Sequence, residues 1–260
     1  MYYPKQIPQL LNQNYRKHIN YHEVQEKSLQ DFIMCIWCIS SKHTLQTPIM
    51  NVVLPDGCID LIIDLKNHEI IFSGFSKNTE DVSLDGDVDF IGVRFKPGAI
   101  YSLFKVPANQ IMNQVIMFHE IEKEYDFEKV FKVNSMEERI DILTQYLLPK
   151  IKQHSDKQFI QLVDTLYTTP THQCVSDIAK KLGYESRQLQ RVFLRHFGVT
   201  PKVLLNILRL HKCLTLLFDH TKCLQDIALE SGFYDQAHFI KEIKRYTGIL
   251  PTTLLDEYSQ

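Results

Sequence analysis

Hydrophobic and polar positions alternate with a period of two in the first part of the chain. In FIGVRF at 90–95, Ile91, Val93 and Phe95 alternate with Phe90, Gly92 and Arg94. This alternation is typical of a strand with two different faces. Other short apolar runs are FIMCIWCI at 32–39, NVVLPDGCIDLIIDL at 51–65, with a turn at PDG, and FSGF at 72–75. These runs predict a curved sheet or a small barrel, and KPGAIYSLFKV at 96–106 predicts a short helix beside it.

The periodicity changes to that of a helix after Asn134. Ser135 and Glu138 match a capping box. The apolar positions behind them step by three or four residues and form one stripe: Met136, Ile140, Leu143, Leu147 and Ile151. This helix packs on its own domain, or it is a dimerisation helix or a connector between domains; the pattern leaves these alternatives open.

A polar segment, QHSDK at 153–157, predicts the boundary between an N-terminal domain, 1–153, and a C-terminal domain, 154–260. Beyond it the chain reads as short helices that end at glycines, with a long helix from Pro201 to about residue 218. The predicted fold class is therefore α+β in two domains. A β-rich N-terminal domain with one or two helices precedes an all-α C-terminal domain.

One phrase occurs twice in the C-terminal domain. DIAKKLGYESRQLQRVFLRHFGVTP at 177–201 is repeated as DIALESGFYDQAHFIKEIKRYTGILP at 226–251. Asp177 and Asp226 are offset by 49 residues and Gly198 and Gly248 by 50, so the second copy has one extra residue before its longer helix. Each copy reads as a short helix, a glycine turn and a longer helix, which predicts helix-turn-helix units at about 174–197 and 223–246.

The longer helix of each unit carries an exposed face that suits DNA. Its outward residues are Arg187, Gln190, Arg191 and Arg195 in the first unit, and Gln236, His238, Lys241 and Arg245 in the second. Arginine and glutamine form paired hydrogen bonds with guanine and adenine edges in the major groove. A solvated helix face is the alternative, but two copies with basic residues at matched positions favour double-stranded DNA.

These two phrases and the linker ILRLHKCLTLL at 207–217 resemble the AraC/XylS family of transcription regulators. The resemblance implies that both units lie in successive major grooves. It maps base-edge contacts onto Arg187, Gln190 and Arg191 in the first unit and onto Gln236, His238 and Lys241 in the second. It maps phosphate contacts onto Arg195 and Arg245.

The resemblance has departures and a second part. Glu185, Ala237 and Ile243 replace residues that are usual in the family, and the closing PTTLL lacks the family's tyrosine-arginine ending. LPDGCIDLI and GVRFKPGA, at 54–62 and 92–99, resemble an N-terminal domain that stands in the position of an effector-sensing module in many AraC-like regulators.

Charge and composition support a two-part protein. Residues 170–260 hold 12 of the 29 basic and 9 of the 31 acidic residues, which leaves residues 1–169 with 17 against 22. The longest apolar run is too short to span a bilayer, and MYYPKQIPQ does not read as a secretory signal. Six cysteines without scaffold-like spacing are typical of reduced thiols, so a cytoplasmic protein without membrane contact is expected.

Several residues of the first domain invite a chemical interpretation. Cys35 and Cys38 have the spacing of a metal or redox pair, but residues three apart on a strand point to opposite faces, so a structural role and no metal are expected. Asp56, Asp60 and Asp64 are spaced by four, which we interpret as solvated carboxylates around a turn rather than a cation site. The candidate effector-binding residues are Arg94, Asp56 and Cys58, with an ordinary ion pair as the alternative for Arg94.

The sequence as a whole predicts a DNA-binding transcription regulator and not an enzyme, with no cofactor. Its expected partners are promoter DNA, a small-molecule effector, RNA polymerase, and a second copy that binds through the N-terminal domain or helix 135–151. The rival hypothesis is a DNA-repair or thiol- and metal-sensing protein that uses Cys35, Cys38 or Cys58.

Overall fold

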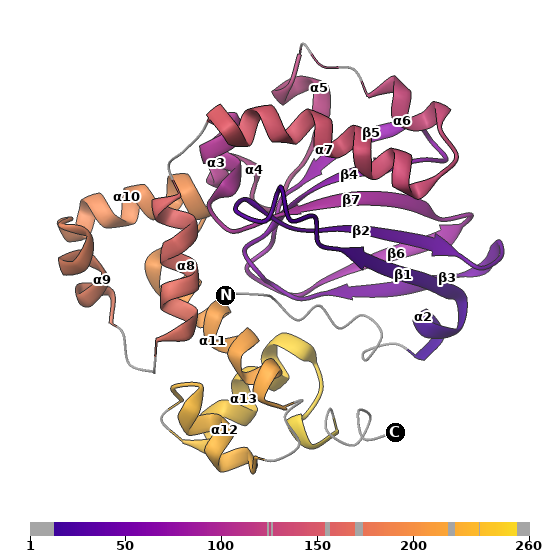
Figure 1. Cartoon of the computed structure of the whole chain (residues 1–260). Coiled ribbons are helices and arrows are strands. Elements are labelled where there is room, and N and C mark those ends of the chain that lie inside the picture. The colour runs from indigo at the N-terminus through magenta and orange to yellow at the C-terminus, as the bar shows by residue number, and fades with distance from the viewer. Residues whose placement is uncertain are drawn as a thin grey trace.

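The chain folds as a β-rich N-terminal part followed by an all-helical C-terminal part, as predicted (Figure 1). The computed structural model describes residues 13–123, 125, 127–153, 157–169, 174–217, 222–233 and 235–253. The predicted boundary segment lies partly outside these residues, as does the expected end of the long helix at residue 218.

The N-terminal part contains two antiparallel sheets. The larger has six strands in the order β1-β2-β7-β4-β5-β8, and the smaller pairs β3 with β6. The strands are β1 (Ile19–Val24), β2 (Ile33–Ser41), β3 (Leu45–Val53), β4 (Ile59–Asp64), β5 (Glu69–Ser73), β6 (Glu80–Gly86), β7 (Asp89–Phe95) and β8 (Val115–Met117).

The alternation in β7 sets the two faces of the larger sheet. Ile91, Val93 and Phe95 have no solvent exposure, and Arg94 lies on the opposite face. Because β2 pairs with β7, Cys38 opposite Ile91 and Cys35 opposite Arg94 also point to different faces. The paired-cysteine metal site is therefore excluded by the strand geometry.

The N-terminal part holds more helices than the one or two expected: α2 (Gln13–His18), α3 (Ala99–Phe104), α4 (Ala108–Ile111), α5 (Phe118–Ile121), α6 (Glu128–Lys132) and α7 (Met136–Gln153). Helix α7 begins at the predicted cap, where the Ser135 hydroxyl accepts a hydrogen bond from the Glu138 amide at 3.2 Å. It lies along the larger sheet, with Met136 against Cys38 and with Leu143 and Leu147 fully buried (Figure 1). The apolar stripe is thus packed within its own domain, and a homodimer would need another surface.

The helices of the C-terminal part are α8 (Gln158–Thr168), α9 (Val175–Leu182), α10 (Ser186–Phe197), α11 (Pro201–Leu217), α12 (Leu224–Glu230) and α13 (Gln236–Thr247). Gly183, Gly198 and Gly248 end α9, α10 and α13 with φ angles of 69°, 71° and 73°. A side chain is strained in this left-handed region, which explains glycine at the predicted helix ends.

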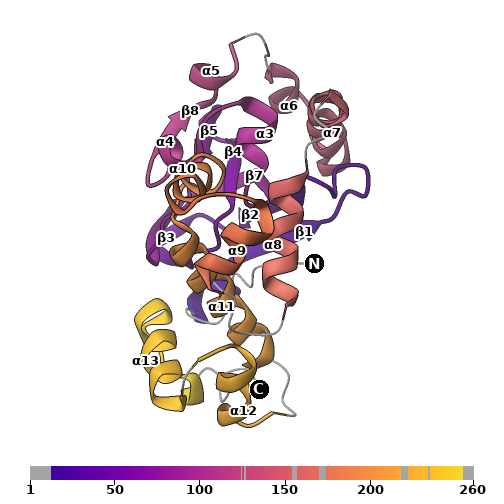
Figure 2. The same ribbon diagram turned by 90° about the vertical axis from the view of Figure 1, so that its left-hand side faces the viewer.

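Packing divides the chain differently from the sequence boundary. One apolar core continues from the sheets into the first helix-turn-helix unit, through Phe159, Leu189, Phe193 and Phe197. A second core holds the second unit and the C-terminal half of α11. The first unit is therefore fused to the sheet domain, and the second unit has a core of its own (Figure 2).

Gly92 is required by the close packing of Trp37 across the β2–β7 pair. A Cβ atom at residue 92 would lie 2.2 Å from the Trp37 ring. We expect Gly92→Ala to lower the free energy of unfolding by about 1–3 kcal/mol, because the ring must move inside a packed sheet. Chemical denaturation measures this change. In Trp37→Leu the same Gly92→Ala change should cost clearly less; an equal cost in both backgrounds would contradict the ring contact.

Candidate nucleic-acid interface and effector cavity

The first helix-turn-helix unit is formed by α9 and α10. The Asp177 carboxylate accepts a hydrogen bond from the Cys174 amide at 3.0 Å and closes the first turn of α9. Leu189 and Phe193 of α10 are fully buried, so the helix is held on one side only. Its other side exposes the three predicted base-edge residues, Arg187, Gln190 and Arg191.

The second unit, formed by α12 and α13, repeats this arrangement. The Asp235 carboxylate accepts a hydrogen bond from the His238 amide at 2.7 Å and caps α13. Phe239 and Ile243 are fully buried, and the predicted residues Gln236, His238 and Lys241 are exposed. The equivalent position of the first unit is Glu185, which forms no side-chain cap; the departure seen in the sequence is thus a real difference between the two helix starts.

The two predicted phosphate contacts are exposed and already oriented by aromatic rings. The Arg195 guanidinium lies 5.6 Å from the centre of the Tyr101 ring, and that of Arg245 lies 4.5 Å from the Tyr246 ring. Arg245 also donates a hydrogen bond to the Tyr246 hydroxyl at 2.6 Å. Both side chains keep their charge at the surface in a restricted orientation, which suits contact with a phosphate backbone.

A cavity of about 360 Å³ lies between the two sheets of the N-terminal part. Its walls come from strands β1 to β8 and from the turn between β3 and β4. Most lining residues are apolar or aromatic, and the polar ones include Arg94 with its two carboxylate partners, Asp56 and Asp60. A cavity of this size and lining is typical of small-molecule sites.

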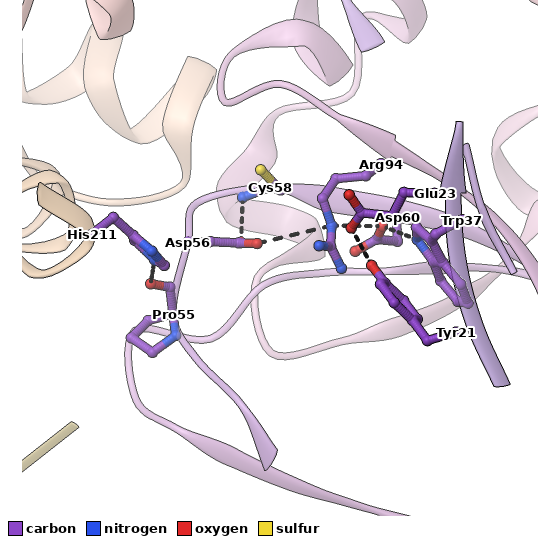
Figure 3. A network of polar contacts seen from close by, with 9 residues as sticks. All are labelled: Tyr21, Glu23, Trp37, Pro55, Asp56, Cys58, Asp60, Arg94 and His211. Atoms are coloured by element: carbon purple, nitrogen blue, oxygen red, sulfur yellow. Dashed lines mark hydrogen bonds and ion pairs between the residues drawn. The ribbon is translucent and has the colours of Figure 1, made fainter. Parts of the chain in front are cut away.

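Arg94 is the centre of a buried polar network at one end of this cavity (Figure 3). Its Nε donates a hydrogen bond to Asp60 Oδ1 at 3.2 Å and lies 3.9 Å from Asp56 Oδ2. Trp37 Nε1 donates to the same Asp60 oxygen at 2.7 Å. Burial works against the charged form of Arg94, but the two carboxylates outweigh it and raise its pKa; burial also raises the pKa of Asp60.

This network corrects the sequence interpretation of the acidic residues. Asp56 and Asp60 are not solvated carboxylates, because the Asp56 residue is 5% exposed and both side chains pair with Arg94. Asp64 alone caps an exposed turn, where it accepts from the amides of Lys66 and Asn67. The spacing of four was misleading because Asp56 belongs to the turn and Asp60 to the cavity face of β4.

Cys38 and Cys58 do not have the environment of a reactive thiol. Cys58 is 2% exposed, and its burial raises the pKa of the thiol well above the ordinary value. Burial likewise raises the pKa of Cys38 to about 11. A nucleophilic cysteine needs a lowered pKa, so these thiols argue against the DNA-repair hypothesis. Within the described residues no group of three or more histidine, cysteine, aspartate or glutamate side chains could hold a metal ion.

The turn between β3 and β4 connects the cavity with the second helix-turn-helix unit. The Asp56 carboxylate accepts from the Cys58 amide at 2.8 Å, and the Pro55 carbonyl accepts from Nε2 of His211, in α11, at 2.8 Å (Figure 3). The Leu54 side chain is 1% exposed and belongs to the core of the second unit. The sequence did not reveal these roles of Leu54 and His211, since both look like ordinary core or surface positions of their segments.

Two family models match the chain. Residues 25–117 match a domain of unknown function, DUF6597, and residues 178–257 match a helix-turn-helix domain. Among curated proteins, the uncharacterised HTH-type transcriptional regulator YidL of Escherichia coli is 30% identical over 110 residues, which cover 42% of this chain and 37% of that protein. YtdP of Bacillus subtilis, also an uncharacterised HTH-type transcriptional regulator, is 21% identical over 57% of this chain and 22% of its own length.

Two solved structures are among those that match the chain. ToxT from Vibrio cholerae has a TM-score of 0.41 at 12% identity, covering 92% of this chain and 97% of that chain. An AraC-type regulator from Chromobacterium violaceum has a TM-score of 0.35 at 29% identity, covering 38% of this chain and 88% of that chain.

The fold and the duplicated units define a protein with two helix-turn-helix units. The chain is similar to AraC-type helix-turn-helix transcriptional regulators, with its match to a helix-turn-helix domain placed behind its match to a DUF6597 domain. The chain spans about a third of YidL and a fifth of YtdP. Within the described residues, no helix is long and apolar enough to cross a membrane.

His211 makes the stability of the chain depend on pH. Burial lowers its pKa from 6.5 to about 4, so the folded chain keeps the neutral ring that donates to Pro55. Below pH 6.5 the unfolded chain gains a proton that the folded chain does not accept until about pH 4. The free energy of unfolding should therefore fall by roughly 3 kcal/mol across this window.

Denaturation midpoints between pH 7 and pH 4 measure this loss. In His211→Gln the part of the pH dependence that belongs to this ring should disappear, even if the variant is less stable at pH 7. An unchanged slope would contradict the assignment to His211.

Proposed function

We propose that the chain is a sequence-specific DNA-binding transcription regulator whose DNA affinity is controlled by a small molecule in the cavity of the N-terminal part. The observation that carries the proposal is the pair of helix-turn-helix units, whose longer helices expose cationic side chains at matched positions, Arg191 with Lys241 and Arg195 with Arg245. The family supports the DNA-binding role. The cavity in the N-terminal part supports control of DNA affinity by a small molecule.

Each longer helix offers its outer face to a major groove. Burial of Leu189 in α10 and of Phe239 in α13 leaves the opposite faces free. Arginine, lysine and glutamine side chains on such a face contact base edges, and flanking arginines contact phosphates. The two units therefore serve as two reading elements on one duplex, joined by α11.

The two reading faces are not equivalent. Arg187 of the first unit corresponds to Ala237 of the second, and Gln190 corresponds to Ile240. Ala237 offers no hydrogen bond, and Ile240 is partly buried against the second core. We infer that the two units read different stretches of an asymmetric DNA site.

Control by an effector would act through the turn at 54–58. The same turn lines the cavity with Pro55 and Asp56 and reaches the second unit with Leu54 and the Pro55 carbonyl. A ligand that binds one arrangement of this turn more tightly than another would shift the position of the second unit. DNA occupancy would follow, since both units must fit the duplex together.

Removal of Arg191 or Lys241 tests the DNA interface. We expect Arg191→Ala and Lys241→Ala each to weaken binding to a selected operator by about 1–3 kcal/mol and to relax base preference locally, because base-edge contacts are lost. Arg195→Ala should instead weaken binding to all DNA sequences alike and reduce the salt dependence of the affinity. In vitro selection followed by titration at two salt concentrations measures both effects.

Lys129→Ala is the matched control for this experiment, since it removes one exposed charge from α6 of the N-terminal part. Its DNA affinity should equal that of the wild type. Wild-type affinity of both Arg191→Ala and Lys241→Ala would mean that the units do not read the groove with these residues.

Truncation of Leu54 tests the connection between the cavity and the second unit. Leu54→Ala should loosen the second core by about 2–4 kcal/mol, because a fully buried side chain is lost. Amide hydrogen exchange should become faster in α12 and α13 while strands β4 and β7 stay protected. Val53→Ala, at the neighbouring half-buried position, should leave α12 and α13 unchanged; an equal effect of the two variants would contradict the role of Leu54.

A further inference from the structure

The cavity between the sheets has an apolar body and an acidic end. Its apolar walls include Ile39, Val52, Ile62, Ile71, Leu84 and Phe90. Its polar end is formed by the network around Arg94 (Figure 3). A cavity with an apolar body and a polar end fits an amphipathic ligand. The charges and hydrogen-bonding groups at the polar end determine which head group binds there.

The charge balance at the polar end is negative. Among the described residues that line the cavity, Arg94 is the one cation, and it lies 3.2 Å from Asp60 and 3.9 Å from Asp56. Glu80, an exposed residue of β6, adds a further carboxylate to the lining outside this pair. A ligand carboxylate or phosphate would meet more negative than positive charge in a partly desolvated space, which excludes Arg94 as a clamp for an anion.

Two buried side-chain oxygen atoms of cavity-lining residues have no partner among the described residues. Tyr15 is fully buried, and its hydroxyl forms no hydrogen bond with the described residues. The buried Asn51 Oδ1 is also unpartnered among them. Both residues line the cavity. A buried polar atom without a partner costs free energy, so a ligand that supplies hydrogen-bond donors would gain from satisfying these atoms.

Aromatic side chains complete the site. Trp37 and Tyr21 line the same end of the cavity as Asp60. The indole nitrogen already donates to Asp60, and the Tyr21 hydroxyl donates to Glu23, so both rings are held in place. Aromatic faces next to carboxylates attract organic cations more than neutral or anionic groups.

We propose that the cavity binds a small apolar amine, with its ammonium group held by the acidic end and its hydrocarbon body against the apolar walls. An ammonium group has three N–H donors and no acceptor. These donors suit the carboxylates beside Arg94, and the oxygen atoms of Asn51 and Tyr15 are further acceptors in the cavity lining. The inference deepens the proposed control by an effector and rests on it only for the consequence at DNA, not for binding.

Phenylbutylamine, phenylbutanol and phenylbutyrate test the head group, since they share one apolar body. Isothermal titration of the full chain at pH 7 should give an affinity for the amine at least about tenfold above that for the carboxylate, with the alcohol between them. Equal affinities, or tighter binding of phenylbutyrate, would overturn the proposal.

Two variants locate the site. Glu80→Gln should weaken binding of the amine and reduce its advantage over the alcohol. Asp81→Asn should bind the amine like the wild type, because Asp81, at the next position of β6, does not line the cavity. Tyr15→Phe should lower the affinity for the amine by about 3- to 10-fold. The free variant should melt at the same or a higher temperature than the wild type, because an unpartnered buried hydroxyl is removed. Unchanged amine binding in both Glu80→Gln and Tyr15→Phe would place the amine elsewhere and overturn the assignment.

DNA titration with and without phenylbutylamine separates this inference from the proposed function. A head-group preference without any change in DNA affinity would support the amine site and overturn effector control. DNA binding by the wild type without any preference for the amine would leave the regulator standing and overturn the amine site.

Discussion

The turn from Leu54 to Cys58 is the constraint on which the arrangement of the chain depends. Within five residues it places a leucine in the core of the second helical unit and a carbonyl on the buried ring of His211. It also places a carboxylate beside Arg94 and a thiol in the sheet core. A tight turn can serve both sides only because its backbone is fixed, and the Asp56 bond to the Cys58 amide and the left-handed Gly57, with φ of 76°, fix it.

The buried network around Arg94 is better understood as a site than as a source of stability. A buried ion pair contributes little to the net free energy of folding, because desolvation of the charges offsets their attraction. Arg94 nevertheless lies on a central strand, buried beside the carboxylates of Asp56 and Asp60. The retained charges and the empty volume beside them are consistent with recognition of a polar group.

Much of the helical part could be predicted from sequence, whereas the cavity could not. The first unit was predicted to end at about residue 197, and α10 ends at Phe197, because Gly198 and the apolar period mark this end. Strands β1 and β6 were not predicted from the sequence. INYHEV and EDVSLDG carry polar residues on the exposed face and too few apolar residues to show an alternating pattern. The partnership of Asp60, Arg94 and Trp37 depends on which strands pair, and strand order leaves no trace in local periodicity. The contacts of Leu54 and His211 could not be predicted for the same reason.

The unequal anchoring of the two helical units is the last consequence of this packing. The first unit shares a continuous apolar core with the sheets, and α10 stacks His196 on Phe159 with 3.8 Å between ring centres. The second unit contacts the N-terminal part through Leu54, His211 and the bond between Thr79 and the Tyr246 carbonyl. A change in the cavity can therefore move the second unit at a much smaller cost in buried area than the first. Since a duplex must accept both units together, displacement of the weakly held one is sufficient to change DNA affinity, and the first unit can remain a fixed reference on the sheet domain.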